Sequence, residues 1–438
     1  KIVQKEYSGS ARVLGGAGTG KTVVAMHRAK HLASKCEGQQ RILVTTFTAN
    51  LAADIRENLR KICTLEELRR IEVIHLEAWV NQFLRESGFS AQIGYDDVIN
   101  PLWEKAVLSA NIDLPFETSF YEEEWNRIAI AQEALTLEKY VRATRNGRGT
   151  RLDRKKRMQV WKVFENYQNL MKENQIRDIN TAMYESTKLL QFVGRKPRYA
   201  SIIIDEGQDF SDNAYRLIRA LAGEEHPNDI FIVGDSHQRI YRNHPTLSKC
   251  GINVRGRSSI LKINYRTTEE IRKYAFALLN GISFDDLDEN SDLGDKCQSL
   301  THGEKPIVEN FENANDEFDF LLHEVKKLKE NSISLTDICV VARTKKLVDD
   351  YIALFTKAGI CAYVIKRNKV DDRSFDGLRV ATMHRVKGLE FKYVFIVAAN
   401  SRIIPLPSAI NKTDPVSEVE SVTSEKCLLY VAMTRAQK

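Results

Sequence analysis

A glycine-rich segment near the start of the chain has the residue types and spacing of a phosphate-binding loop. Gly15 to Thr22 reads Gly-Gly-Ala-Gly-Thr-Gly-Lys-Thr and matches GxxxxGK[ST]. It lies between an apolar run ending at Leu14 and a helix-patterned stretch from Val23, so its backbone N–H groups would surround phosphate oxygens at a helix N-terminus. We predict that ATP and Mg²⁺ bind here, the lysine reaching the β- and γ-phosphates and the threonine holding the metal. The residues of this predicted site are Gly16, Ala17, Gly18, Thr19, Gly20, Lys21 and Thr22.

Two adjacent carboxylates, Asp205 and Glu206, follow the apolar run Ile202-Ile203-Ile204. A run of this kind is typical of a buried strand, so the carboxylates would lie at a strand end. Asp205 would bind Mg²⁺, usually through water, and Glu206 would orient and deprotonate an attacking water. Together with the loop, this pair predicts that the bound ATP is hydrolysed.

The elements that must position these residues are short apolar runs that alternate with helix-patterned stretches. Continuous runs of this length fit strands buried on both faces of a parallel sheet. They occur at residues 11–14, 42–45, 202–204 and 230–233, and again at 338–341, 361–365, 380–382 and 393–397. We therefore predict an α/β fold with two domains, each built around a parallel sheet.

A helical segment interrupts the first of these domains. From about residue 81 to 196 the chain is rich in Trp, Tyr, Glu and Lys at helical spacing and has few β runs. The predicted division is residues 1–82 and 197–262 for the first, ATP-binding core, 83–196 for a helical insertion, and 263–438 for the second core.

Composition excludes several classes of protein. The chain has 438 residues, of which 43% are apolar and 28% charged, as in a globular protein of several domains. No apolar run approaches the roughly 18 residues that span a membrane. The seven cysteines are scattered without a CxxC pair, which argues against a disulfide framework or zinc site and favours a cytoplasmic protein. A net charge of +6 permits a polyanionic partner without requiring one.

Further motifs, in a fixed order, resemble those of superfamily 1 helicases of the UvrD/Rep/PcrA type. Asp205-Glu206-Gly207-Gln208-Asp209 is similar to the DExQD box of that family. The other segments that carry the resemblance are Thr45–Asn50, Gly234–Tyr241 (GDxxQxIY), Asn264–Thr267 (NYRS), Thr382–Phe391 (TxHxxKGLEF) and Leu429–Ala436 (LYVAxTRA). The resemblance implies two RecA-like P-loop NTPase cores with parallel sheets, plus a helical insertion in the first.

The resemblance also implies roles for single residues. Gln208 and Gln238 would couple the γ-phosphate to the nucleic-acid side, Tyr265 would stack on adenine and Glu390 would contact the ribose. Arg266 and Arg435 would reach the γ-phosphate from the second core. The implied catalytic set is Lys21, Asp205, Glu206, Gln238, Arg266 and Arg435, with Thr22 and Asp205 as the metal ligands.

Four features depart from the pattern of the family. The glutamine that reads adenine falls just before Lys1, and Asn243 stands where the family has a base-stacking tryptophan. The interval near Lys366–Gly377 is too short for the large second accessory domain, which we expect to be missing. The chain also stops at Lys438, directly after the last motif. In the family the missing second accessory domain contacts duplex and regulates unwinding, so strong unwinding is less expected than translocation.

Several residues are candidates for contacting nucleic acid. Phe47 occupies a place where the family stacks a base, and aromatic stacking suits a motor because it tolerates every base. A place in the core is the alternative. His75, Arg343 and His384 match positions on the nucleic-acid side of the family, and a structural role is the alternative for each. Tyr241 is assigned to the same side by resemblance.

A basic run in the helical insertion contains Arg148 and Arg151. Charge of this density can neutralise phosphates and would make binding sensitive to salt. A solvated charged surface is the alternative. We expect both arginines to bind the strand, because the insertion lies where the first accessory domain of the family meets DNA.

The combined prediction is an ATP-dependent single-stranded DNA translocase or helicase, moving 3′ to 5′ by resemblance. One alternative is an ATP-driven remodeller of protein–nucleic acid complexes, or an RNA motor, with weak unwinding. A second alternative is a nucleotide-switched motor subunit of a nuclease or defence assembly.

Overall fold

The computed structural model describes residues 1–438 except 146–147, 193–198, 241–244, 286–290, 293–296, 367–370, 373 and 413. Its larger sheet has six parallel strands in the order β3-β2-β6-β7-β1-β8. The strands are β1 (Ala11–Gly15), β2 (Ile42–Thr46), β3 (Ile71–His75), β6 (Ser201–Ile204), β7 (Ile230–Gly234) and β8 (Ser258–Leu261). The predicted α/β class and parallel sheets are thus confirmed.

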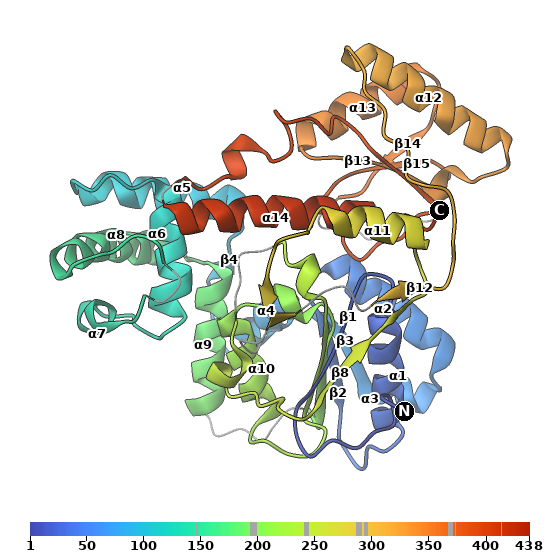
Figure 1. Ribbon diagram of the computed structural model, residues 1–438. Helices are drawn as coiled ribbons and strands as arrows, with labels where there is room; N and C mark the ends of the chain where they lie inside the picture. Colours follow the sequence, from blue (N-terminus) through green and yellow to red (C-terminus); the bar gives the residue numbers. More distant parts are fainter. Residues whose placement is uncertain are drawn as a thin grey trace.

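Helices cover both faces of this sheet, which explains why its strands are apolar without alternation (Figure 1). Along β6, Ile203 packs on one face with Val13 and Val44, whereas Ile202 and Ile204 pack on the other. The covering helices are α1 (Lys21–Ala33), α2 (Ala49–Ile62) and α3 (Leu65–Arg70) on the first face, and α4 (Leu76–Glu86), α9 (Ile179–Phe192) and α10 (Asp212–Ala222) on the second.

The insertion lies between β3 and β6 and carries its own aromatic core. Its elements are β4 (Gln92–Ile93), α5 (Asp96–Ala110), α6 (Thr118–Glu124), the π-helix η1 (Trp125–Ile130), α7 (Leu137–Arg142), α8 (Arg154–Glu173) and β5 (Ile176–Arg177). Helices α4 and α9, at its two ends, share the core of the larger sheet, and α4 runs across residue 83. The domain boundaries given above stay predictions.

The second sheet has four parallel strands in the order β14-β15-β13-β16. They are β13 (Ile338–Ala342), β14 (Ala362–Val364), β15 (Leu378–Thr382) and β16 (Tyr393–Ile396). Helices α12 (Ala314–Glu330) and α13 (Lys345–Lys357) cover one face, and α11 (Glu269–Ala277) and α14 (Pro415–Met433) cover the other. Residues 365–377 alone connect β14 to β15, which is too short a segment for a further domain.

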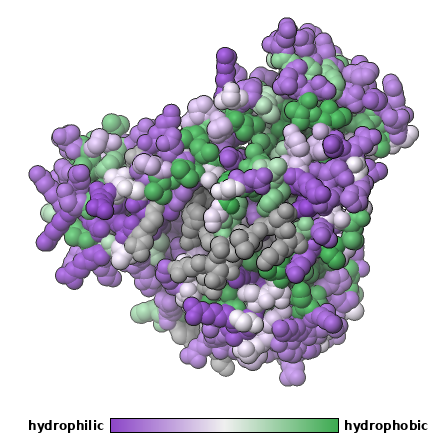
Figure 2. Space-filling view, viewed as in Figure 1, coloured by the Kyte–Doolittle hydropathy of each residue, from purple (hydrophilic) through white to green (hydrophobic). Residues whose placement is uncertain are grey.

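Short elements complete the described chain. They are the strands β9 (Ile263–Asn264), β10 (Phe284–Asp285), β11 (Ser291–Asp292) and β12 (Gln298–Ser299), and the 3₁₀ turns η2 (Gly207–Asp209), η3 (Ser236–Gln238), η4 (Leu247–Cys250), η5 (Leu335–Asp337) and η6 (Pro407–Ala409). On the face shown in Figure 2, hydrophilic residues dominate the rim of the molecule. Among the described residues, no helix is both long and apolar enough to cross a membrane.

Trp103 is expected to be a main source of stability in the insertion. Its ring is 1% exposed and stacks on Tyr167 with centroids 3.7 Å apart, which joins α5 to α8. Trp103→Ala should destabilise the protein by about 3–5 kcal/mol because it leaves a large cavity. Urea unfolding followed by circular dichroism measures the change. Leu108→Ala on the same helix, at a side chain 80% exposed, is the control, and equal losses in both variants would contradict the prediction.

Candidate functional site

The residues predicted to bind and hydrolyse ATP gather at the carboxyl ends of neighbouring strands of the six-stranded sheet. Gly15 ends β1, Asp205 follows β6 and Asp235 follows β7. Parallel strands bring their carboxyl ends to one edge, where ligands of open α/β sheets bind. Helix α1 begins at Lys21, directly after the glycine-rich loop, so the N-terminus of the helix faces this edge.

The loop requires glycine at two positions. Gly20 has φ 81° and precedes α1, and Gly18 has φ 73°, which is the left-handed region that favours glycine. A Cβ atom on Gly18 would lie 2.1 Å from Oδ1 of Asn264, and the Tyr265 backbone N–H donates to the Gly18 carbonyl at 2.9 Å. The segment after β9 therefore packs directly on the loop.

Lys21 points back into its own loop. Its Nζ donates to the carbonyl oxygens of Gly15 and Gly16, each at 2.9 Å, and lies 3.7 Å from Oδ2 of Asp235. Burial alone would raise the pKa of Asp235, but Lys21 and His237 hold it well below its usual range. The Asp235 carboxylate is therefore ionised beside the loop.

Thr22 and Asp205 form a pair suited to Mg²⁺. The Thr22 hydroxyl donates to Oδ2 of Asp205 at 2.7 Å. A hydroxyl and a carboxylate oxygen in contact are the hard oxygen ligands that Mg²⁺ takes in proteins. Burial, followed by the charge of Glu206, raises the pKa of Asp205 to about 7, and a bound cation would favour its ionised form.

Glu206 is held in a strained and charged setting. It has φ 55°, uncommon for a residue with a side chain, and it accepts a hydrogen bond from Nε2 of Gln208. Burial alone would raise the pKa of Glu206, but Lys387, Lys21 and Arg435 lower it below its ordinary value. An ionised carboxylate at this place can accept a proton from water.

A hydrogen-bonded relay crosses the site from one half of the chain to the other. Gln208 Oε1 accepts from the Asp235 backbone N–H at 2.9 Å, and Gln238 Nε2 donates to Oδ2 of Asp235 at 2.6 Å. Arg435 Nη2 then donates to Gln238 Oε1 at 2.8 Å. Burial, followed by the charge of Arg266, lowers the pKa of Arg435 to about 10, so it stays a cation at neutral pH.

The remaining residues predicted for nucleotide binding lie around this relay. Arg266 forms an ion pair with Glu390. Tyr265 has a side chain that is 62% exposed beside the loop. The structure therefore brings the predicted nucleotide residues into one place, from segments far apart in the sequence.

Lys387 and Asp209 belong to this place but were missing from the predicted site residues. Lys387 Nζ lies 2.6 Å from Oδ2 of Asp209 and donates to the Gln238 carbonyl at 2.6 Å, and both side chains are buried. Burial raises the pKa of Asp209 to about 7 although Lys387 opposes the shift. Both residues stand within quoted motifs, yet nothing in their spacing pairs them.

Phe47 lies beside a narrow crevice that reaches the carboxylates of Glu206 and Asp209. Its ring is half-buried and meets Phe210 edge to face, with centroids 6.1 Å apart. The crevice is lined by Thr46, Phe47, Thr48, Leu51, Glu206, Asp209, Lys387 and Gly388. A residue predicted to contact the strand thus lies next to Glu206, the residue predicted to activate water.

The structure favours a structural role for Arg343. The other two candidates, His75 and His384, are partly buried. Arg343 is buried and donates two hydrogen bonds to Glu425, at 2.8 and 2.6 Å. Burial, followed by the charge of Arg343, lowers the pKa of His384 to about 4. Burial and Arg56 lower the pKa of His75, which precedes α4. The expectation that Arg343 contacts nucleic acid is therefore corrected, since its guanidinium is already bound by a carboxylate.

The expectation for Arg148 is also corrected. Its side chain is 1% exposed and pairs with Glu123 at 2.6 Å and Glu124 at 3.2 Å. Arg145 binds the same Glu124. Carboxylates of α6, distant in sequence, thus neutralise part of the basic run, whereas Arg151 is exposed. Tyr241, like Asn243, lies outside the described residues.

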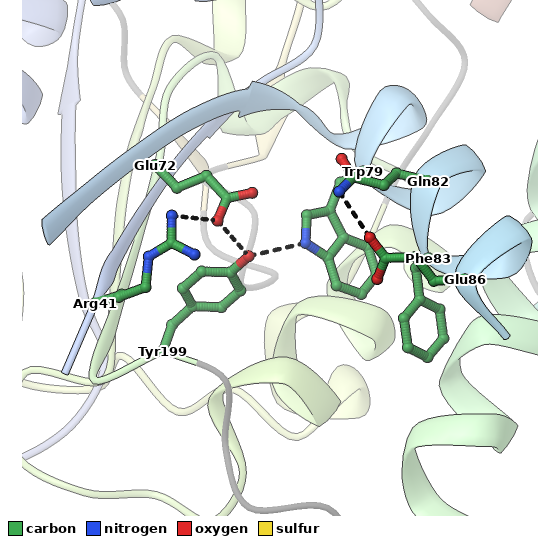
Figure 3. Close-up of a pocket in the computed structure, with 7 residues that line it drawn as sticks. All are labelled: Arg41, Glu72, Trp79, Gln82, Phe83, Glu86 and Tyr199. Atoms are coloured by element: carbon green, nitrogen blue, oxygen red, sulfur yellow. Dashed lines mark hydrogen bonds and ion pairs between the residues drawn. The ribbon is translucent and has the colours of Figure 1, made fainter. Parts of the chain in front are cut away.

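A larger cavity of about 350 Å³ lies at the opposite edge of the sheet (Figure 3). Arg41 and Tyr199 precede β2 and β6, so they mark the amino ends of the strands. The polar groups that line the cavity are hydrogen-bonded to one another. Trp79 Nε1 donates to the Tyr199 hydroxyl at 2.9 Å, and that hydroxyl donates to Oε2 of Glu72 at 3.1 Å. This cavity is separate from the nucleotide residues.

Comparison with known proteins assigns both halves of the chain to one family. Residues 1–244 match the UvrD/REP helicase N-terminal domain, and residues 259–375 and 365–438 match the UvrD-like helicase C-terminal domain.

Individual relatives carry helicase names. A probable DNA helicase of Mycoplasma pneumoniae is 25% identical, with 97% of this chain and 79% of the relative aligned. The ATP-dependent DNA helicase PcrA of Leuconostoc citreum is 25% identical over 77% of this chain and 45% of its own length. PcrA of Staphylococcus aureus is 23% identical over 93% and 54%. This chain spans about half the length of the two PcrA proteins.

The partly buried His384 should make stability depend on pH. Its pKa falls from 6.5 to about 4 on folding, so the unfolded chain binds more protons between these values and stability is lost as pH falls below 6.5. The loss should reach about 2 kcal/mol at pH 5 relative to pH 7.5. Urea unfolding at both pH values should show a smaller difference for His384→Asn. The exposed His323, replaced by Asn, is the control; an unchanged pH difference in His384→Asn would refute the assignment.

Proposed function

This chain belongs to the UvrD/REP helicase family, and on that premise we propose that it is an ATP-driven motor that moves along single-stranded DNA. The observation that carries the proposal is the contact of Arg435, from the second half of the chain, with Gln238 beside the phosphate-binding loop. Guanidinium groups stabilise the charge that develops in phosphoryl transfer, so supplying them from a second unit couples hydrolysis to closure.

The chain's own residues divide the chemistry among them. Lys21 would exchange its loop carbonyls for the β- and γ-phosphate oxygens of ATP, and Tyr265 would stack on the adenine. Thr22 and Asp205 would hold Mg²⁺, which neutralises phosphate charge when bound. Arg266 and Arg435 would bind the γ-phosphate.

Glu206 is proposed as the general base. Its lowered pKa keeps it ionised, so it can take a proton from the water that attacks the γ-phosphorus. The bond to the β–γ bridging oxygen breaks, and ADP and phosphate result. Gln208, bonded to both Glu206 and the Asp235 backbone, would sense whether the γ-phosphate is present.

Strand contact would reach this centre through the crevice beside Phe47. A base stacked on Phe47 would adjoin Lys387, whose ammonium group is paired with Asp209. Movement of the strand would then be coupled to movement of Lys387, because Phe47 and Lys387 line the same crevice. Among the basic residues of the insertion, Arg151 is the exposed candidate for phosphate contact.

Several finer features belong to the same proposal. The proposed domains are residues 1–82 with 197–262 for the first core, 83–196 for the insertion, and 263–438 for the second core. Movement is proposed to run 3′ to 5′, with ATP and Mg²⁺ as cofactors and single-stranded DNA as partner. The cysteines among the described residues are free, which supports a cytoplasmic location.

Glu206→Gln tests the assigned base. The variant should bind ATP normally and hydrolyse it at least about a hundredfold more slowly, because an amide cannot accept the proton. Phosphate release and binding of a fluorescent nucleotide measure the two effects separately. Glu330→Gln, at an exposed position on α12, is the matched control. Near-normal turnover of Glu206→Gln would refute the role of Glu206.

Translocation along end-labelled strands of increasing length tests the motor itself. A signal whose delay grows with strand length and requires ATP supports movement. Binding without length-dependent kinetics would instead indicate a nucleotide-switched module. Faster ATP hydrolysis with RNA than with DNA would indicate an RNA motor.

A further inference from the structure

The insertion touches the second half of the chain through an ion pair far from the nucleotide residues. Arg127 of η1 donates to both carboxylate oxygens of Glu420 on α14, at 2.6 and 3.2 Å. Each side chain is 21% exposed. A bidentate, largely buried pair holds a defined geometry and is weakened less by solvent than an exposed pair.

Neighbouring contacts place the start of α14 against the insertion. Asn411 donates to Glu123 at 3.0 Å, and Glu123 also binds Arg148. Asp414 caps α14 by accepting from the backbone of Val416 and Ser417. A Cβ atom on Gly149 would lie 2.0 Å from this carboxylate, so the backbone of the insertion abuts the helix cap.

The insertion is itself fixed to the larger sheet. The Arg216 guanidinium of α10 donates to the Ala131 carbonyl directly after η1, and Lys188 of α9 pairs with Glu133 at 2.6 Å. Helices α9 and α10 pack on the larger sheet. Arg127 therefore moves with the first half of the chain.

Helix α14 connects the contact with the insertion to the predicted nucleotide site. Its 19 residues form a rod of about 28 Å that reaches from the insertion towards α11 (Figure 1). Arg435 follows its C-terminal end and bonds back to the Val431 carbonyl at 2.9 Å, so the guanidinium moves with the helix. One end of a rigid element thus bears Glu420, and the other bears the arginine of the nucleotide site.

We propose that Arg127 and Glu420 are positioning residues: their ion pair ties α14 to the insertion and thereby holds Arg435 on the relay of Asp235 and Gln238. The contacts close a ring that runs from the larger sheet through the insertion and α14 back to that sheet. Rotation of the second half away from the nucleotide site must break the pair or drag the insertion along. Two sites that share one rigid element are coupled, and the coupling is reciprocal.

The pair should therefore tune nucleotide affinity without touching nucleotide. Arg127→Gln and Glu420→Gln should each raise the KM for ATP at least about fivefold, because the closed arrangement becomes less populated. The kcat should change less, since the reacting groups are intact once the site closes. The charge swap Arg127→Glu with Glu420→Arg should restore most of the lost affinity, which a merely structural defect would not allow.

Arg177→Gln is the matched control. Arg177 pairs with Glu185 at 2.9 Å, and the two side chains are 23% and 24% exposed, but Glu185 lies on α9 and the pair does not reach the second half. Its KM should equal that of the wild type. An equal rise in Arg177→Gln, or a failure of the swap to rescue, would overturn the proposal.

A distance measurement separates this inference from the proposed function on which its kinetic consequence rests. Dyes on azide-bearing residues introduced at Lys105 of α5 and Lys357 of α13, both exposed, report the gap between the insertion and the second half. Without nucleotide, Arg127→Gln should shift energy transfer towards longer distances, and the swap should reverse the shift. Unchanged transfer overturns the proposal. Absence of ATP hydrolysis in the wild type would contradict the proposed function. The distance measurement would still show whether the Arg127–Glu420 pair holds the second half against the insertion.

Discussion

Burial of charge between the two sheets is the constraint on which the rest of the structure depends. Lys387 and Asp209 meet there without access to water, and Arg435 lies beside them on Gln238. Desolvation of such groups costs as much as their pairing returns, so they contribute little to stability. A bound phosphate, or movement of the second half of the chain, can therefore rearrange these charged groups at little cost to stability.

The buried charges are brought together by strands that end at the same edge of the larger sheet. Strands β1, β6 and β7 are buried on both faces and end at the same edge, which places the loop, the carboxylate pair and the relay within reach of one another. Helix α14 then brings one more cation from the opposite sheet. The strain at Glu206, with φ 55°, occurs where the chain turns out of β6 into this crowded space.

The insertion shows how sequence patterns can mislead about surface charge. A dense basic run predicts a phosphate-binding surface, yet Arg148 and Arg145 are neutralised by Glu123 and Glu124 of α6. The acidic residues precede the run by some twenty positions, so no local pattern shows the pairing. The same reason applies to Arg343, whose partner Glu425 lies on α14.

The sequence by itself determined the fold class and the two parallel sheets, and it supplied the residues proposed to bind nucleotide. Glycine spacing, apolar runs and carboxylates at strand ends are local features, and each follows from backbone geometry or from burial on both faces of a sheet. Only the tertiary structure decided which charges meet. In the folded chain Lys387 pairs with Asp209, and Arg127 pairs with Glu420. The Arg148 side chain is buried against Glu123. Ion pairs between distant segments depend on how two sheets and an insertion pack, and no periodicity in the chain records that packing.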